Sequence, residues 1–119
     1  MEKNLFENLN TFARTIKEGI DIQALAFRPL KDFRGYDLYV DGFFFTKGNY
    51  GEQVVVVAHT LDNVGIKVNM PSRAVEQFKN IQANKEMLDA VLTGHLMLTG
   101  IRETKTKNGT TTAYEYKTI

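Results

Sequence analysis

Apolar and polar residues alternate most regularly between residues 36 and 46, and this period of two is typical of a β-strand with two different faces. One face of the predicted strand carries Tyr36, Leu38, Val40 and Phe44. The opposite face carries Asp37, Tyr39, Asp41, Phe43, Phe45 and Lys47. Because three consecutive phenylalanines cannot all point into one core, at least one ring of the run 43–45 needs another partner.

Two further strands are expected to follow this one. Residues 53–59 contain four consecutive valines, which predicts a strand buried on both faces. The turn-rich loop at 47–51 makes a hairpin the economical connection between the first two strands. Ile66, Val68 and Met70 then alternate as a third strand. The three segments together predict a β-meander.

A helical stretch and a second hairpin complete the C-terminal half. Residues 72–92 keep an apolar face with helical spacing, which residues 82–84 can divide into two short helices, and Gly94 ends the stretch. Residues 95–119 are predicted to form two strands. Asn108-Gly109 supplies the two residues that most readily adopt positive φ in a two-residue hairpin turn.

The N-terminal segment is expected to add a helix and a strand. Residues 4–18 space their apolar side chains as one helical stripe, which consists of Leu5, Leu9, Phe12 and Ile16. Asn4 and Glu7 are placed like a capping box, and Gly19 is a plausible end of the helix. Residues 20–28 shift toward alternation and predict an extra strand.

Length and charge limit the possible classes. The 119 residues predict a single domain, 1–119, with a core that needs no staple. The chain contains no cysteine, which excludes a disulfide framework and thiolate metal sites. With 15 basic and 14 acidic residues, any binding of nucleic acid must be local rather than a bulk charge effect. We expect no signal peptide and no membrane-spanning segment.

The order strand, strand, strand, helix, strand, strand with short loops is that of an OB-fold, a five-stranded Greek-key barrel. We therefore predict a mainly β fold with helices: an OB barrel with one helix between its third and fourth strands and an additional N-terminal helix. In such barrels the ligand surface lies on the central strands and their flanking loops.

The second half of the chain makes the comparison more specific. Residues 64–70, which lead into a helix, and residues 96–102 and 110–116, which flank a basic loop, resemble single-stranded DNA-binding proteins. The whole chain resembles the small proteins of this family encoded by lactococcal phages. The resemblance covers roughly seventy per cent of the length, from about Gly35 to Ile119, and carries no invariant signature. It implies a protein that coats and protects single-stranded DNA during phage replication or recombination in the bacterial host cytoplasm.

The candidate site combines aromatic rings, on which unpaired bases stack, with cations, which bind phosphates. This chain lacks the tryptophan frequent in the bacterial relatives, so tyrosine and phenylalanine must provide the stacking. The rings that we expect to stack are Tyr39, Phe43, Phe45 and Tyr50. The cations that we expect to bind phosphates are Lys47, Arg102, Lys105 and Lys107.

Each of these assignments has a structural alternative. Residues 4–18 or another subunit can cover Phe43 and Phe45, and the hairpin lysines can simply be solvated. Tyr114 and Tyr116 share one face of the last strand and either extend the stacking surface or pack half-buried. The basic loop around Arg28, Lys31 and Arg34 is equally consistent with local salt pairing.

The sequence gives little support for catalysis. His59 and His95 lie on separate predicted strands, and Asp37 and Asp41 have no third acidic or histidine partner nearby, so we expect no enzyme activity, no metal and no cofactor. The expected partners are single-stranded DNA, further copies of the chain in a dimer or tetramer, and phage or host recombination and replication proteins. Two other hypotheses remain: an OB-like structural module of a phage assembly, and an RNA-binding OB domain.

Overall fold

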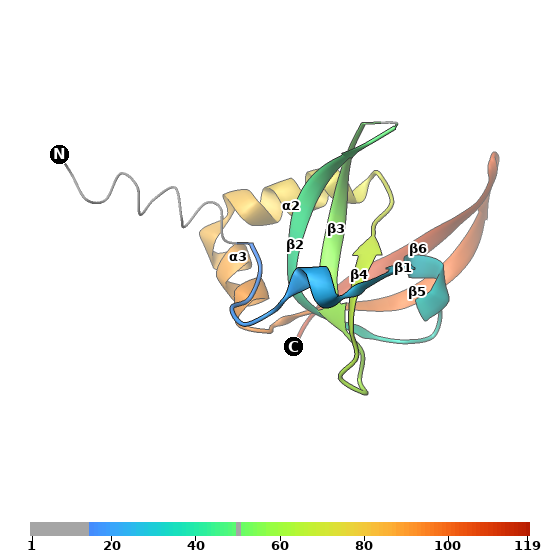
Figure 1. The fold of residues 1–119 in the computed structure, drawn as a ribbon. Helices are drawn as coiled ribbons and strands as arrows, with labels where there is room; N and C mark the ends of the chain where they lie inside the picture. Colours follow the sequence, from blue (N-terminus) through green and yellow to red (C-terminus); the bar gives the residue numbers. More distant parts are fainter. Residues whose placement is uncertain (1–14, 50) are drawn as a thin grey trace.

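The computed structural model describes residues 15–49 and 51–119, and Figure 1 shows their arrangement. The strands are β1 (Ala26–Pro29), β2 (Leu38–Gly48), β3 (Gly51–His59), β4 (Gly65–Asn69), β5 (Leu96–Thr106) and β6 (Gly109–Thr118). The helices between β4 and β5 are α2 (Ala74–Ala83) and α3 (Lys85–Leu92). The short 3-10 helices on either side of β1 are η1 (Ile22–Ala24) and η2 (Leu30–Phe33). None of the helices in this part of the chain is long and apolar enough to cross a membrane.

The strands form one six-stranded mixed sheet with the order β1-β4-β3-β2-β5-β6. β1 pairs with β4 in parallel, and every other neighbouring pair is antiparallel. The sheet curls into a half-barrel (Figure 1). The mainly β class is therefore confirmed, but the closed five-stranded barrel is wrong. Closure would require β4 to pair with β6, and β1 already occupies that edge of β4.

A β-bulge in β2 decides which of its side chains face the core. Val40 pairs with Ala58 and Gly42 pairs with Val57, so Asp41 is an extra residue on β2. An extra residue shifts the alternation by one, and side chains that follow the bulge change faces.

The predicted faces of the phenylalanine run are therefore wrong. Phe43 and Phe45 lie on the same face as Leu38 and Val40, because the bulge separates the two pairs of residues. Phe43 is completely buried, and Phe45 packs against the same core. Phe44 lies on the other face and is half-buried. Regular alternation predicted the reverse.

The core fills the inner side of the curled sheet. Phe43 packs its ring on Phe78 of α2, with ring centroids 4.9 Å apart. The two helices add further buried side chains, namely Ala74, Val75, Ile81, Leu88 and Val91. Burial of this apolar face is what holds the helices on the sheet.

The predicted division of the helical stretch is confirmed. Asn84 separates α2 from α3, with extended backbone angles (φ −106°, ψ 109°). Its side-chain Oδ1 accepts a hydrogen bond of 3.0 Å from the backbone N–H of Met87, which caps the start of α3. Gly94 follows α3 with φ +83° and ends the stretch, as expected.

The helix predicted over residues 4–18 falls mostly on residues outside the described part of the chain. Its last four residues are not helical. Ile16 forms an isolated antiparallel bridge with Gly42 of β2, where a Cβ on the glycine would come within 2.5 Å of Ile16 Cα. The strand predicted over 20–28 is shorter in the structure, where it corresponds to β1. The first part of the segment forms η1 instead, because Asp21 caps this short 3-10 turn.

The basic hairpin forms as predicted, but its turn is shifted by one residue. Thr106 pairs with Gly109, so Lys107 and Asn108 occupy the turn. Gly109 has φ +126°, whereas Asn63 is the one non-glycine residue with positive φ in the described chain. Glycine alone thus supplies the left-handed conformation that the turn requires, and Asn108 need not adopt it.

Candidate nucleic-acid interface

The four predicted stacking rings lie in different surroundings. Phe43 has an exposed fraction of 0%, so its ring has no surface left for a base. Phe45 is half-buried, with its ring edge-to-face on Phe43 at 5.8 Å. Tyr39 alternates with the core residues of β2 and therefore lies on the outer face of the sheet. Tyr50 lies outside the described residues.

Of the predicted cations, Lys105 and Lys107 lie on an arm formed by residues 102–113. β5 pairs with β2 only at Leu38↔Leu98 and Tyr39↔Met97, so beyond the bulge at Thr99 the one strand that it pairs with in the described part of the chain is β6. The arm consequently projects beyond the rest of the sheet (Figure 1). Both lysines are exposed, and neither belongs to an ion pair among the described residues.

The other two predicted cations, Lys47 and Arg102, differ in whether they already have an acidic partner. Lys47 is exposed near the β2–β3 tip and has no ion pair with any described residue. Arg102 donates to the carbonyl of Gly100 at 2.7 Å and lies 3.4 Å from Glu115. Its guanidinium is therefore partly neutralised on the outer face of the hairpin, which makes it a weaker phosphate ligand than the lysines.

The inner face of the same hairpin brings together cations and rings. In β6 the side chains of Thr112, Tyr114 and Tyr116 share this face, because they alternate along the strand, and Lys105 pairs opposite Thr110 on the same side. Arg73, immediately before α2, donates at 2.7 Å to the carbonyl of Thr112. Its guanidinium carbon also lies 5.0 Å from the Tyr114 ring centroid. We call this set, Lys105, Arg73, Tyr114 and Tyr116, the hairpin surface.

Gln77 of α2 fixes the two tyrosines. Both hydroxyls donate to its Oε1, at 2.8 Å from Tyr114 and 2.5 Å from Tyr116. The two rings meet edge-to-face at 5.5 Å. Burial, followed by the hydrogen bond with Tyr114, raises the pKa of Tyr116 above its ordinary value. These contacts hold the rings in one orientation, although 37% of Tyr116 remains exposed.

A separate polar cluster lies on the outer face of β2 and β3. His59 Nδ1 donates to Asp41 Oδ2 at 2.7 Å, and the imidazole stacks on Tyr39 with centroids 5.3 Å apart. Asp41, the bulge residue, is only 7% exposed. The pairing gives the Nδ1 atom of His59 a carboxylate partner.

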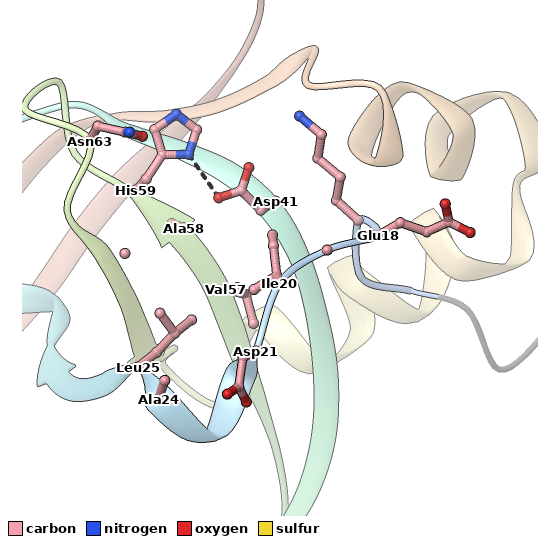
Figure 2. A pocket seen from close by; sticks show the side chains of 13 residues that line it. Glu18, Ile20, Asp21, Ala24, Leu25, Asp41, Val57, Ala58, His59 and Asn63 are labelled. Carbon is pink, nitrogen blue, oxygen red and sulfur yellow. Dashed lines mark hydrogen bonds and ion pairs between the residues drawn. The ribbon is translucent and has the colours of Figure 1, made fainter.

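Next to this cluster is an open pocket of about 520 Å³. Figure 2 shows His59 and Asp41 at one side, with Ile20, Asp21 and Leu25 on the N-terminal segment that crosses the sheet. Among the described residues the lining contains no serine, threonine or cysteine, so the His–Asp pair has no hydroxyl or thiol to activate there. In the described chain no group of three or more histidines, cysteines and carboxylates is placed to hold a metal ion.

The basic loop 28–34 is salt-paired, which was the structural alternative for this loop. Arg28 lies 3.2 Å from Asp32 and 5.6 Å from the centroid of the Phe33 ring. Arg34 lies 3.4 Å from Glu103 of β5. These guanidinium groups already have carboxylate partners, so the loop offers less free positive charge than the sequence indicates.

The sequence did not predict Arg73 of the hairpin surface or Gln77, which binds its two tyrosines. Both belong to the helical segment, and no local pattern places that segment beside β6. The available signal was indirect: Tyr114 and Tyr116 share a face and need partners for their hydroxyls when half-buried. Comparison of the chain with family models, curated proteins and solved structures finds no match.

Proposed function

We propose that this protein is a non-catalytic binder of single-stranded DNA, which it coats and protects during phage replication or recombination. The observation that carries the proposal is the hairpin surface, where Lys105 and Arg73 lie on the same face as Tyr114 and Tyr116. Cations that follow the backbone together with rings that contact bases are the usual means of gripping an unpaired strand.

The chemistry of the hairpin surface suits a flexible strand. Lys105 and Lys107 have no acidic partner among the described residues, so each can neutralise a phosphate and release condensed counterions without first breaking an ion pair. Arg73 is held by Thr112 and Tyr114, and its planar guanidinium can stack on a base or bind a phosphate. The exposed part of Tyr116 offers a further contact for a base.

The stacking assignment changes as a result. Phe43 has no exposed surface, so we assign no base contact to it. Tyr114 and Tyr116, with Arg73, replace it, and Lys47 is a further phosphate ligand on the neighbouring hairpin. Stacking is worth ~1–3 kcal/mol per base, so two such contacts add several powers of ten to a modest phosphate contribution.

The direct test is a titration of the full chain into labelled oligo-dT, duplex DNA and RNA at several salt concentrations. We expect tightest binding to oligo-dT. The double variant Lys105→Ala with Lys107→Ala should weaken binding and flatten the slope of log affinity against log salt by about 1.4, since each phosphate contact on a single strand contributes about 0.7. Binding to none of the three probes would overturn the proposal.

Lys85→Ala is the matched control. Lys85 is an exposed lysine at the start of α3, on the opposite side of the molecule from the arm (Figure 1). The Lys85→Ala substitution removes one positive charge but should leave the slope of log affinity against log salt unchanged. If the control reduced the slope by about half as much as the double arm variant, which is the same loss per lysine removed, binding would depend on net charge and not on the hairpin surface.

A divalent-metal assay tests the non-catalytic part of the proposal. Full-length protein incubated with labelled DNA and Mg²⁺ or Mn²⁺ should leave the DNA intact. Cleavage that an Asp37→Ala change abolished would contradict a purely binding role.

A further inference from the structure

β6 has a free edge in the part of the chain that the structure describes. It is the last strand of the sheet and pairs there with β5 only. It is ten residues long, contains no proline and has no bulge of its own. An exposed strand edge of this length is a template for pairing with another strand.

Two hydrogen bonds establish which residues of β6 offer their backbone groups to a new strand. The N–H of Ile119 donates to the carbonyl of His95 at 2.9 Å, so the odd-numbered residues face β5. The carbonyl of Thr112 points away from β5, because Arg73 binds it. The backbone groups of Tyr114, Tyr116 and Thr118 therefore point outward, since neighbouring residues in an antiparallel strand alternate.

The C-terminal half of this edge is accessible. Every residue from Glu115 to Ile119 is exposed. Ile119 itself is a large apolar residue with 45% of its surface exposed. This segment thus combines outward backbone groups with an uncovered apolar side chain.

The side chains of β6 that lie on the outer face of the sheet form a self-complementary sequence when two copies of the strand run antiparallel. On the outer face of the sheet, the order along the strand is Ala113, Glu115, Lys117, Ile119. If two copies of β6 run antiparallel with Tyr116 at the centre, Glu115 lies opposite Lys117 of the second copy and Ala113 lies opposite Ile119. Opposite charges then pair with each other and apolar residues pair with each other, and the two-fold symmetry makes each pair occur twice.

The neighbouring registers are not complementary. Because outward residues must pair with outward residues, the centre can move only by one residue at a time to Glu115 or Lys117. Centring on Glu115 places two carboxylates opposite each other, and centring on Lys117 does the same with two ammonium groups. Like charges directly opposite each other destabilise a strand pair. The sequence of β6 therefore favours the register centred on Tyr116 over both of its neighbours.

We propose that two copies of this chain associate through antiparallel pairing of their β6 strands, centred on Tyr116, to form one continuous twelve-stranded sheet. The two-fold axis passes between the Tyr116 residues. The two arms then point in opposite directions, one at each end of the dimer. This association does not depend on nucleic acid, and it stands or falls separately from the proposed DNA binding.

A charge exchange tests the register. Glu115→Lys alone and Lys117→Glu alone each turn two attractive cross-strand pairs into repulsive ones, which should raise the dimer dissociation constant by about tenfold or more. A one-to-one mixture of the two variants restores opposite charges at both positions, and sedimentation velocity should show the dimer again. The ion pair of Glu115 with Arg102 within one chain cannot explain this rescue, because mixing does not restore it.

The matched controls are Lys85→Glu and Glu86→Lys on α3, which make the same charge changes at exposed positions away from β6. Both should dimerise like the unaltered chain. The assignment would be overturned by an unaltered chain that stays monomeric at millimolar concentration. It would also be overturned by single β6 variants that dimerise normally, or by a mixture that does not recover.

A cysteine placed on the two-fold axis provides a second measurement that does not depend on charge. The chain contains no cysteine, so Tyr116→Cys introduces a unique thiol that faces its own copy at a distance suited to a disulfide. Mild oxidation should cross-link this variant efficiently. Thr118→Cys is the control, because residue 118 pairs with residue 114 of the other copy and lies too far from its own counterpart. Equal cross-linking at both positions would contradict the register.

Discussion

The two hairpins of this protein share their construction but differ in what they bury. Each begins its second strand with a glycine in the left-handed region, Gly51 at φ +117° and Gly109 at φ +126°. The β2–β3 hairpin lies in the middle of the sheet, and its residues Val54 to Ala58 are completely or almost completely buried. The β5–β6 hairpin lies at the edge and exposes most of its outer half.

This difference in burial indicates that the β2–β3 hairpin contributes mainly to stability and the β5–β6 hairpin mainly to recognition. Side chains of β2–β3 have neighbours on both faces, since Val57 faces the outer pocket that Ile20 and Leu25 also line. In the described chain, the contacts that link the arm to residues outside the hairpin lie near its base, where Arg34 lies 3.4 Å from Glu103 and Arg73 binds the carbonyl of Thr112. We therefore expect substitutions in the first hairpin to change mainly the free energy of unfolding, and substitutions in the second to change mainly binding.

The largest expected effect is that of Phe43→Ala. The ring is completely buried against Phe78, so its removal leaves a cavity and should lower the free energy of unfolding by about 3–5 kcal/mol. Urea denaturation followed by circular dichroism measures this loss. Phe27→Ala, which truncates a ring that is 56% exposed, is the control and should cost less than about 1 kcal/mol. Equal losses would show that the burial of the Phe43 ring does not set the cost of its removal.

Asp41→Ala should have the next largest effect. Its carboxylate is nearly buried and accepts the hydrogen bond from His59, so the substitution leaves the imidazole without its partner. We expect a loss of about 1–3 kcal/mol in the free energy of unfolding. Asp37→Ala is the control, because that exposed carboxylate accepts a hydrogen bond of 2.7 Å from Thr99. A cost no larger than that of the control would show that the bulge tolerates loss of the pair.

The bulge also shows where sequence reasoning stops. The period of two located β2, and the valine run located β3 as a strand buried on both faces. The extra residue Asp41, however, is defined only by the partner strand, where the residues opposite Val40 and Gly42, Ala58 and Val57, are directly adjacent in the chain. No local pattern in residues 36–46 reveals a mismatch of one residue with a segment that follows later in the chain. The faces of Phe43 and Phe45 could therefore not be derived.

The candidate site divides in the same way. The cations of the arm were predictable, because Lys105 and Lys107 lie shortly before Asn108-Gly109, a turn sequence that can be recognised from local information alone. The contacts of Tyr114 with Arg73 and Gln77 required knowing that α2 lies beside β6. The parallel pairing of β1 with β4, which leaves β6 at an edge, is likewise a long-range contact that propensity does not encode.

Tyr116→Phe is expected to produce a smaller effect with a characteristic pH dependence. Burial raises the pKa of Tyr116 in the folded chain, so the folded state holds this proton more tightly than the unfolded state does. Its contribution to stability is fully present below the ordinary tyrosine pKa of about 10 and is lost as the pH rises above it. Near neutral pH we expect a cost of about 0.5–1.5 kcal/mol for the lost hydrogen bond to Gln77.

The measurement for Tyr116→Phe is the free energy of unfolding at intervals from neutral pH to above pH 10. The unaltered chain should lose stability more steeply in the alkaline range than the variant. Lys79 donates a hydrogen bond to Glu52, which raises the pKa of the lysine, so it contributes a loss of the same sign in both proteins and cancels in the comparison. Parallel curves would mean that the hydroxyl is not protected in the folded state.

The smallest expected effect on stability is that of Lys105→Ala combined with Lys107→Ala, and it gives the sharpest contrast with Phe43→Ala. Both side chains are exposed and form no ion pair with any described residue, so the free energy of unfolding should change by less than about 0.5 kcal/mol. Urea denaturation tests this on the same samples used for the salt titrations. If the variant unfolds like the unaltered chain but binds oligo-dT with a flatter salt dependence, the arm acts in recognition alone. A loss of stability comparable to that of Phe43→Ala would mean that the arm supports the fold, and weakened binding could then no longer be attributed to lost phosphate contacts.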